Sequence, residues 1–172
     1  QAIEAKLQQD TEAAAEEKKK APVLSVGPGG LRVSSADKSY ELRVGGSVGY
    51  DMAWFRQDDE LKQAVGDEQD GTGFRFARIR LQGKLTENVG FRAEYDFAGQ
   101  NGQDTPVFRD VYIDYLGIPW GGERAFDIRA GHFREPFSLE ELTGIANRTF
   151  VERSLANVFV PGRNAGIQIS DA

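Results

Sequence analysis

The side chains best placed to do chemistry are cations spaced two apart in residues 74–85, which read FRFARIRLQGKL. Side chains alternate between the two faces of a strand. Arg78, Arg80 and Lys84 would therefore share one face, with positions two residues apart separated by about 7 Å. Guanidinium groups bind phosphate through two parallel hydrogen bonds and stay charged at any working pH. The spacing predicts a cationic surface that can bind small anions.

Neighbouring segments carry further charges in phase with this row. Arg43 and Arg129 fall on the polar faces of two other segments that alternate in the same way. Those polar faces also hold acidic side chains, namely Glu41, Asp51, Glu94, Asp96, Asp110, Asp114 and Asp127. The opposite faces hold almost no charge. Each predicted strand would therefore separate an apolar face from a face that mixes both signs of charge.

About six segments alternate in this way and predict an all-β, antiparallel chain. The longest covers residues 40–55 and would extend about 50 Å, whereas strands in globular sheets usually hold only ~5–6 residues. Tyr40 near one end, with Tyr50 and Trp54 near the other, would suit two aromatic belts at membrane interfaces. The remaining segments are residues 74–85, 89–98, 107–116, 125–133 and 165–170.

An apolar face opposite a charged face has two explanations. In a soluble antiparallel sheet, the apolar face packs on a core and the polar face meets water. In an outer-membrane barrel, the apolar face meets lipid and the polar face lines a water-filled lumen. The strand length, the aromatic positions and the alternation of long and short connections favour the second case, part of an antiparallel transmembrane β-barrel.

Three segments outside these strands have distinct compositions. Residues 1–20 are rich in Ala, Glu, Lys and Gln, which predicts a solvated helix or a short coiled coil. Residues 21–30 contain Pro and Gly and are expected to link this segment to the barrel portion, residues 31–172. Residues 134–164 form a very long connection, in which Ser138 and Glu141 fit a capping box that starts a short helix. A connection of this length is more often functional than neutral, the alternative being an ordinary external loop.

The overall composition argues against several classes of function. The chain has 172 residues and a net charge of −6, which gives no support to nucleic-acid binding. It has no Cys, so disulfides and Cys-ligated metals are excluded. Mean hydropathy is −0.49, and no apolar run is long enough for a transmembrane helix. The single His, His132, joins no nucleophile or metal constellation, so we expect neither an enzyme nor a bound cofactor or metal.

Several segments, in chain order, resemble the phosphate-selective porin O and P family. They are RIRLQGKL, FRAEYDFAG, FRDVYIDYLG, IRAGHFREPFSLEELTG and TFVERSLANVFVPGRNAGIQIS, and together the resemblance runs from about residue 30 to 170. Family members are trimeric outer-membrane barrels of about sixteen strands, a size that leaves an aqueous channel. The resemblance implies that this chain is the N-terminal portion of such a barrel, that residues 1–20 are periplasmic, and that residues 134–164 fold inward as a constriction loop.

The resemblance also implies site residues, with inorganic phosphate or other small anions as the solute. It places Arg75, Arg153 and Asp110 near a central anion site, and Arg134 at a position that is commonly basic in the lumen. Two positions depart from the family pattern, because Ser47 and Phe76 stand where arginines are usual. These losses predict a broader anion preference, or a general porin. A third alternative is a structural outer-membrane protein, tethered through residues 1–20, that has no channel activity.

Overall fold

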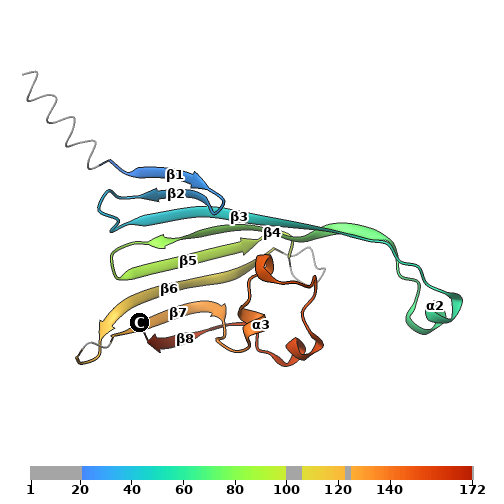
Figure 1. Ribbon diagram of the computed structural model, residues 1–172. Coiled ribbons are helices and arrows are strands. Elements are labelled where there is room, and N and C mark those ends of the chain that lie inside the picture. The colour runs from blue at the N-terminus through green and yellow to red at the C-terminus, as the bar shows by residue number, and fades with distance from the viewer. Residues whose placement is uncertain (1–20, 100–105, 123–124, 172) are drawn as a thin grey trace, which may run out of the picture.

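The computed structural model describes residues 21–99, 106–122 and 125–171. They form one eight-stranded antiparallel sheet in which the strands follow chain order, from β1 to β8 (Figure 1). The strands are β1 Val23–Gly27, β2 Gly30–Ser34, β3 Glu41–Ala53, β4 Gly71–Lys84, β5 Val89–Asp96, β6 Val107–Pro119, β7 Ala125–Arg134 and β8 Arg163–Asp171. The sheet is open, with β1 and β8 at its edges. The helix predicted for residues 1–20 lies outside the described residues.

The prediction of an all-β, antiparallel chain is confirmed, with eight strands in place of about six. The difference arises in residues 21–34, where the expected linker contains β1 and leads directly into β2. Gly27 pairs with Gly30, so Pro28 and Gly29 form a tight hairpin turn. Gly30 has a φ of 100°, and a Cβ there would lie 2.1 Å from the Val44 carbonyl oxygen. The Pro and Gly residues therefore mark a turn between two short strands.

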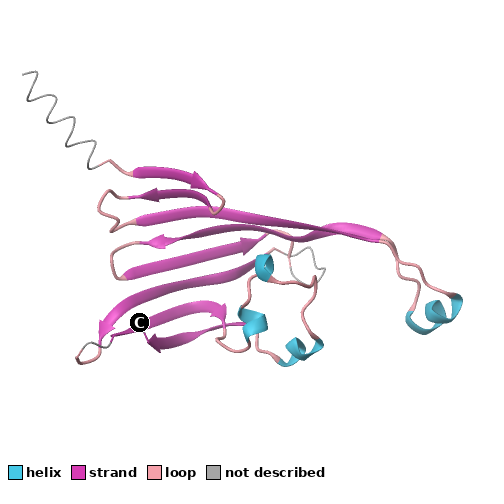
Figure 2. Cartoon of the chain, in the orientation of Figure 1, coloured by secondary structure: helices cyan, strands magenta, loops and turns pink. Residues whose placement is uncertain are grey.

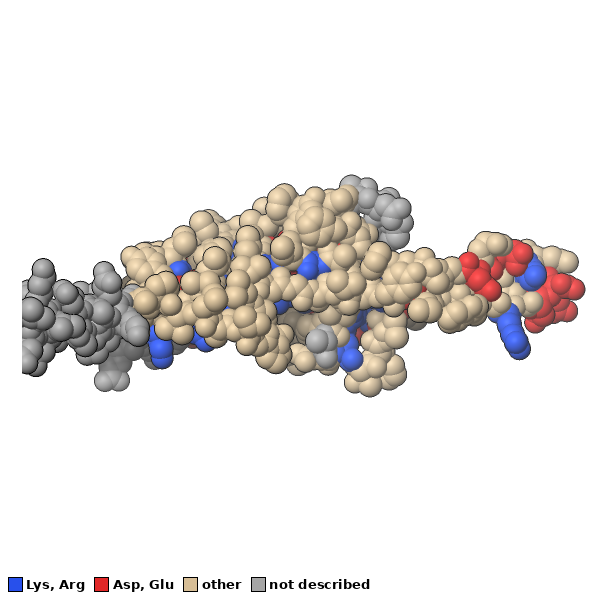
Figure 3. All heavy atoms as spheres, turned by 90° about the horizontal axis from the view of Figure 1, so that it is seen from above, with Lys and Arg blue, Asp and Glu red and all other residues tan. Residues whose placement is uncertain are grey.

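From β3 onward, long and short connections lie at opposite ends of the sheet (Figure 2). At one end, β4 joins β5 through residues 85–88. At the other end, β3 joins β4 through residues 54–70, which contain the helix α2 Asp59–Val65. Asp58 caps α2 by accepting a hydrogen bond from the Leu61 amide. Figures 1 and 3 show α2 at the tip of an arm that projects beyond the sheet, where acidic side chains gather.

The connection between β7 and β8, residues 135–162, is long and carries three short helices. They are α3 Leu139–Leu142, η1 Ile145–Asn147 and η2 Leu155–Phe159. The predicted N-cap is confirmed, because Ser138 caps α3 and its hydroxyl accepts from the Glu141 amide. The Glu141 side chain takes no part in a capping box and instead forms ion pairs with Arg134 and Arg153. We call residues 135–162 the long loop. Across the described part of the chain, no helix is long and apolar enough to span a membrane.

Burial in this sheet is reversed relative to a sheet that packs on an apolar core. Among the described residues, only two large hydrophobic side chains are buried, Phe76 and Phe133, whereas four buried side chains are acidic: Glu94, Asp96, Asp110 and Glu141. The apolar faces of the strands are exposed or half-buried. Their exposed members include Val48, Tyr50, Met52, Ile79, Leu81, Ile113, Tyr115, Ile167 and Ile169. The charged face is therefore the packed face of the sheet.

Candidate functional site

The predicted row of cations is matched by carboxylates on the adjacent strands. Arg78 lies opposite Asp96 in the β4–β5 register, and its Nε donates to the Asp96 carboxylate over 2.7 Å. The next pair along β4, Arg80 and Glu94, repeats this geometry at 2.7 Å. Arg129 pairs with Asp114 across β6 and β7 in the same way, whereas Arg43 pairs with Glu41 two residues away on its own strand. This face is therefore a lattice of ion pairs in which most of the arginine charge is balanced.

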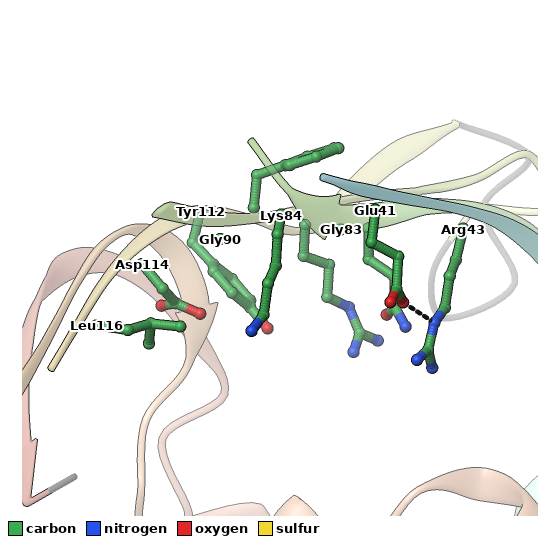
Figure 4. Close-up of a pocket in the computed structure, with 11 residues that line it drawn as sticks. Glu41, Arg43, Gly83, Lys84, Gly90, Tyr112, Asp114 and Leu116 are labelled. Carbon is green, nitrogen blue, oxygen red and sulfur yellow. Dashed lines mark hydrogen bonds and ion pairs between the residues drawn. The ribbon is translucent and has the colours of Figure 1, made fainter. Parts of the chain in front are cut away.

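Lys84, the last cation of the row on β4, differs from Arg78 and Arg80 in its surroundings. It lies at the end of β4 beside a hollow of about 450 Å³ that is also lined by Arg43, Arg92, Glu41 and Asp114. Figure 4 shows Lys84 and Arg43 extending from the sheet into this hollow. Within the described residues, Lys84 makes no ion pair. Glu41 lies opposite Lys84 in the β3–β4 register, but its carboxylate pairs with Arg32 and Arg43 instead.

A β-bulge turns Arg75 toward the charged face. Gly49 pairs with Phe76 and Tyr50 pairs with Phe74, which leaves Arg75 as an extra residue on β4. Simple alternation would have put Arg75 among the apolar side chains. Instead its Nε donates to the Asp51 carboxylate, which belongs to the charged face of β3.

A second bulge, in β6, brings two more charged side chains to the same face. Ala93 pairs with Val111 and Tyr95 pairs with Phe108, so Arg109 and Asp110 together oppose one residue of β5. The carbonyl oxygen of Arg109 lies 2.6 Å from Nδ1 of His132 on β7, which gives the lone histidine a structural contact at the bulge.

Asp110 is held by two arginines from different strands. Arg163 of β8 donates to both of its carboxylate oxygens, at 2.8 and 3.3 Å, and Arg92 of β5 lies 3.5 Å away. The Asp110 side chain is 12% exposed. This predicted site residue therefore links β5, β6 and β8, and its carboxylate is already bound to protein cations.

Glu141 of the long loop likewise binds two arginines from different parts of the chain. Its buried carboxylate lies 3.3 Å from Nε of Arg134 and 3.0 Å from Nη1 of Arg153. Its carbonyl oxygen accepts from both arginines as well. Two predicted cations, one from β7 and one from the loop, thus converge on one carboxylate and fix the loop against the sheet.

The long loop and the strand wall enclose a cationic groove with a volume of about 870 Å³. Five arginines line it, against two carboxylates. The wall contributes Arg75, Arg78, Arg109 and Asp51, and the loop contributes Arg148, Arg153 and Glu152. The lining of this space has a larger excess of cations than that of the hollow beside Lys84. We call this space the arginine groove.

Arg148 is a cation that the long loop contributes to this groove. It makes no ion pair with any described residue, and its Nε is buried without a hydrogen-bond partner. Burial and the neighbouring charge of Arg153 lower the pKa of Arg148. An anion in the groove would offset both effects, because it would supply an acceptor and a balancing charge.

A sequence profile described as "Phosphate-selective porin O and P" matches residues 42–171. The chain belongs to this family. A relative named Porin O, from Pseudomonas aeruginosa, is 26% identical over 143 residues, which cover 83% of this chain and 29% of the relative. The chain thus spans less than a third of that porin's length.

Ser47 and Phe76, the two positions that depart from the arginine pattern of the porin family, both lie next to Arg78. Ser47 pairs with Arg78 across β3 and β4, so a short hydroxyl lies beside the cation that Asp96 balances. The ring of Phe76 is buried over Gly49, and the Arg78 guanidinium lies 4.8 Å from its centroid. A Cβ on Gly49 would lie 2.4 Å from this ring. Phe76 therefore supports Arg78 through a cation–π contact at a wall of the arginine groove.

The porin fold brings only some of the predicted site residues together. Arg75, Arg78 and Arg153 line the arginine groove, whereas Arg43 and Lys84 lie beside the separate hollow near the other end of β4. Arg80, Asp110, Arg129 and Arg134 line neither space and serve in ion pairs. Arg109 and Arg148 were missed, because one depends on a bulge and the other on the path of a loop. A role for any of these residues in anion binding stays a prediction.

Proposed function

We propose that this chain forms the N-terminal part of an outer-membrane porin barrel that passes small anions, inorganic phosphate among them. Membership of the porin O and P family supports this proposal. So does the distribution of side chains, because the apolar faces are exposed and the charged face is packed and hollowed. That arrangement suits a wall between lipid and a water-filled lumen. The proposal needs neither a cofactor nor catalysis.

The observation that carries the proposal is the arginine groove, with its five arginines against two carboxylates. An anion that enters it could exchange part of its hydration shell for guanidinium donors on both sides. Arg148 and Arg153 would approach from the loop, and Arg75 from the wall. Conduction needs binding that is favourable but weak, which several shared partial contacts can provide. Lys84, beside the hollow at the other end of β4, would offer the anion a further positive charge along its path.

A second candidate is a general porin with weak anion preference. The lattice of ion pairs favours it, because Arg78 and Arg80 are balanced by Asp96 and Glu94 at 2.7 Å. In that case the arginine groove would bias the current toward anions without binding phosphate in preference to chloride. The two candidates differ in one observable, the block of chloride current by phosphate.

The proposed porin would also have a defined assembly and orientation in the membrane. We propose a homotrimer embedded in outer-membrane lipid, with residues 1–20 on the periplasmic side. Cross-linking of the complete protein in lipid vesicles would give a trimer band. A protease added outside intact cells would leave the N-terminal segment uncut, whereas cleavage there would contradict the periplasmic placement.

The test of solute preference measures phosphate block of chloride current through single channels of the complete protein in a planar bilayer. Arg148→Gln should raise the half-blocking phosphate concentration roughly three- to tenfold, the range for losing one charge-assisted contact partly screened by water. Arg56→Gln is the matched control, since Arg56 is exposed in the β3–β4 connection and lines neither the groove nor the hollow. Wild-type channels without phosphate block would favour the general porin, and an absence of any conductance would contradict both candidates.

A further inference from the structure

Glu152 differs from the other carboxylates that face the arginines. Its Oε1 lies 2.7 Å from Nη1 of Arg75, and its side chain is 76% exposed. In contrast, the carboxylates of Asp96 and Glu94 are 1% and 2% exposed, each in strand-to-strand ion pairs. Glu152 lies in the long loop and lines the arginine groove. It is therefore an anionic group at the edge of a cationic space, held by a single ion pair.

Arg75 is engaged from both sides of the groove at once. Its Nε donates to Asp51 of β3, and its Nη1 donates to the Val151 carbonyl oxygen over 3.2 Å and faces Glu152. The wall contact is a cross-strand neighbour, fixed by the β3–β4 bulge. The Glu152 contact comes from a loop side chain that carries no other hydrogen bond or ion pair among the described residues. Glu152 is the partner that can leave without disturbing the sheet.

We propose that the Glu152 carboxylate is a resident competitor of the transported anion and sets how tightly the arginine groove binds it. Between passages, Glu152 occupies the Nη1 side of Arg75. An arriving anion displaces it, gaining the guanidinium and the nearby charge of Arg148. When the anion moves on, Glu152 returns and blocks rebinding. The inference rests on the proposed anion channel and deepens it, because it names the residue that weakens binding enough for release.

The exposure of the Glu152–Arg75 ion pair limits how much Glu152 can weaken anion binding. Exposed ion pairs hold their partners only weakly, so Glu152 can weaken anion binding by roughly two- to fivefold. Glu152→Gln keeps the shape and removes the charge. It should lower the half-blocking phosphate concentration by about that factor and lengthen each blocking event. Glu68→Gln is the matched control, since Glu68 is exposed on the α2 arm and lines neither the groove nor the hollow.

A double-mutant cycle tests whether Glu152 acts through Arg75. In the Arg75→Gln background, the gain from Glu152→Gln should fall below about 1.5-fold, because the shared partner is gone. The measurement uses single channels of the complete protein, with inorganic phosphate as the blocking ion.

Three results would overturn the inference. If Glu152→Gln leaves the block unchanged while wild-type channels prefer anions, Glu152 does not compete and the anion channel itself stands. If the gain persists in full without Arg75, competition for that guanidinium is wrong. If wild-type channels prefer cations, the proposed function fails, and the inference fails with it.

Discussion

Asp96 is the residue on which the balanced arginine lattice can be tested most sharply. It is fully buried, and its carboxylate accepts from Arg78 at 2.7 Å and from the Ala77 and Ala98 amides at 3.0 and 3.3 Å. Removing one partner of a buried ion pair costs about 3–5 kcal/mol. Asp96→Asn retains one acceptor oxygen for the Ala77 amide, so we expect the lower end, about 3 kcal/mol in the free energy of unfolding.

The assay is urea unfolding of the complete protein in lipid vesicles, followed by tryptophan fluorescence. Asp67→Asn is the matched control, because Asp67 forms an exposed pair with Lys62 at 3.3 Å on the α2 arm. That loss should cost under about 1 kcal/mol. Equal costs for the two variants would refute the view that the charged face is held together by buried ion pairs.

The remaining predictions concern the sheet and the long loop. Gly83→Ala should prevent correct β3–β4 pairing, since a Cβ there would lie 1.8 Å from the Glu41 carbonyl oxygen. On gels run without boiling, the band of heat-stable folded protein should be lost. Gly73→Ala is the control, because a Cβ at Gly73 meets no atom within 4 Å. Hydrogen bonds from the Ser154 hydroxyl and amide lower the pKa of Glu140. This contact is complete above the ordinary carboxyl pKa of 4.5 and is lost as pH falls through the lowered folded value. Protease resistance of the loop should therefore drop in acid, and Glu140→Gln should remove that pH dependence.

The sequence predicted the alternating faces well, because a period of two needs only local geometry. The prediction of which face each side chain occupies failed where a β-bulge interrupts the regular strand. The bulges at Arg75 and Arg109 each shift the alternation by one residue, and no residue type in the sequence marks where the extra residue falls. The partner of Arg78 depends on the β4–β5 register, so its balance by Asp96 could not be predicted from either strand alone.

The loop was predictable only at its start. The N-cap at Ser138 is a local signal, and α3 begins there. The position of Arg148 in the arginine groove depends on how Glu141 binds Arg134 and Arg153, which are contacts between separate elements. The helix α2 was missed as well, although Asp58 supplies its N-cap and Gly66 its C-cap.

The function that we propose for this chain is to line a channel that prefers anions. The most direct measurement is the reversal potential of the complete protein in a planar bilayer with a tenfold gradient of potassium chloride. We expect a potential with the sign of the chloride equilibrium potential. Arg148→Gln should bring it closer to zero, and Arg56→Gln should not. A wild-type potential with the sign of the potassium equilibrium potential would mean that the channel prefers cations, the opposite of what we propose.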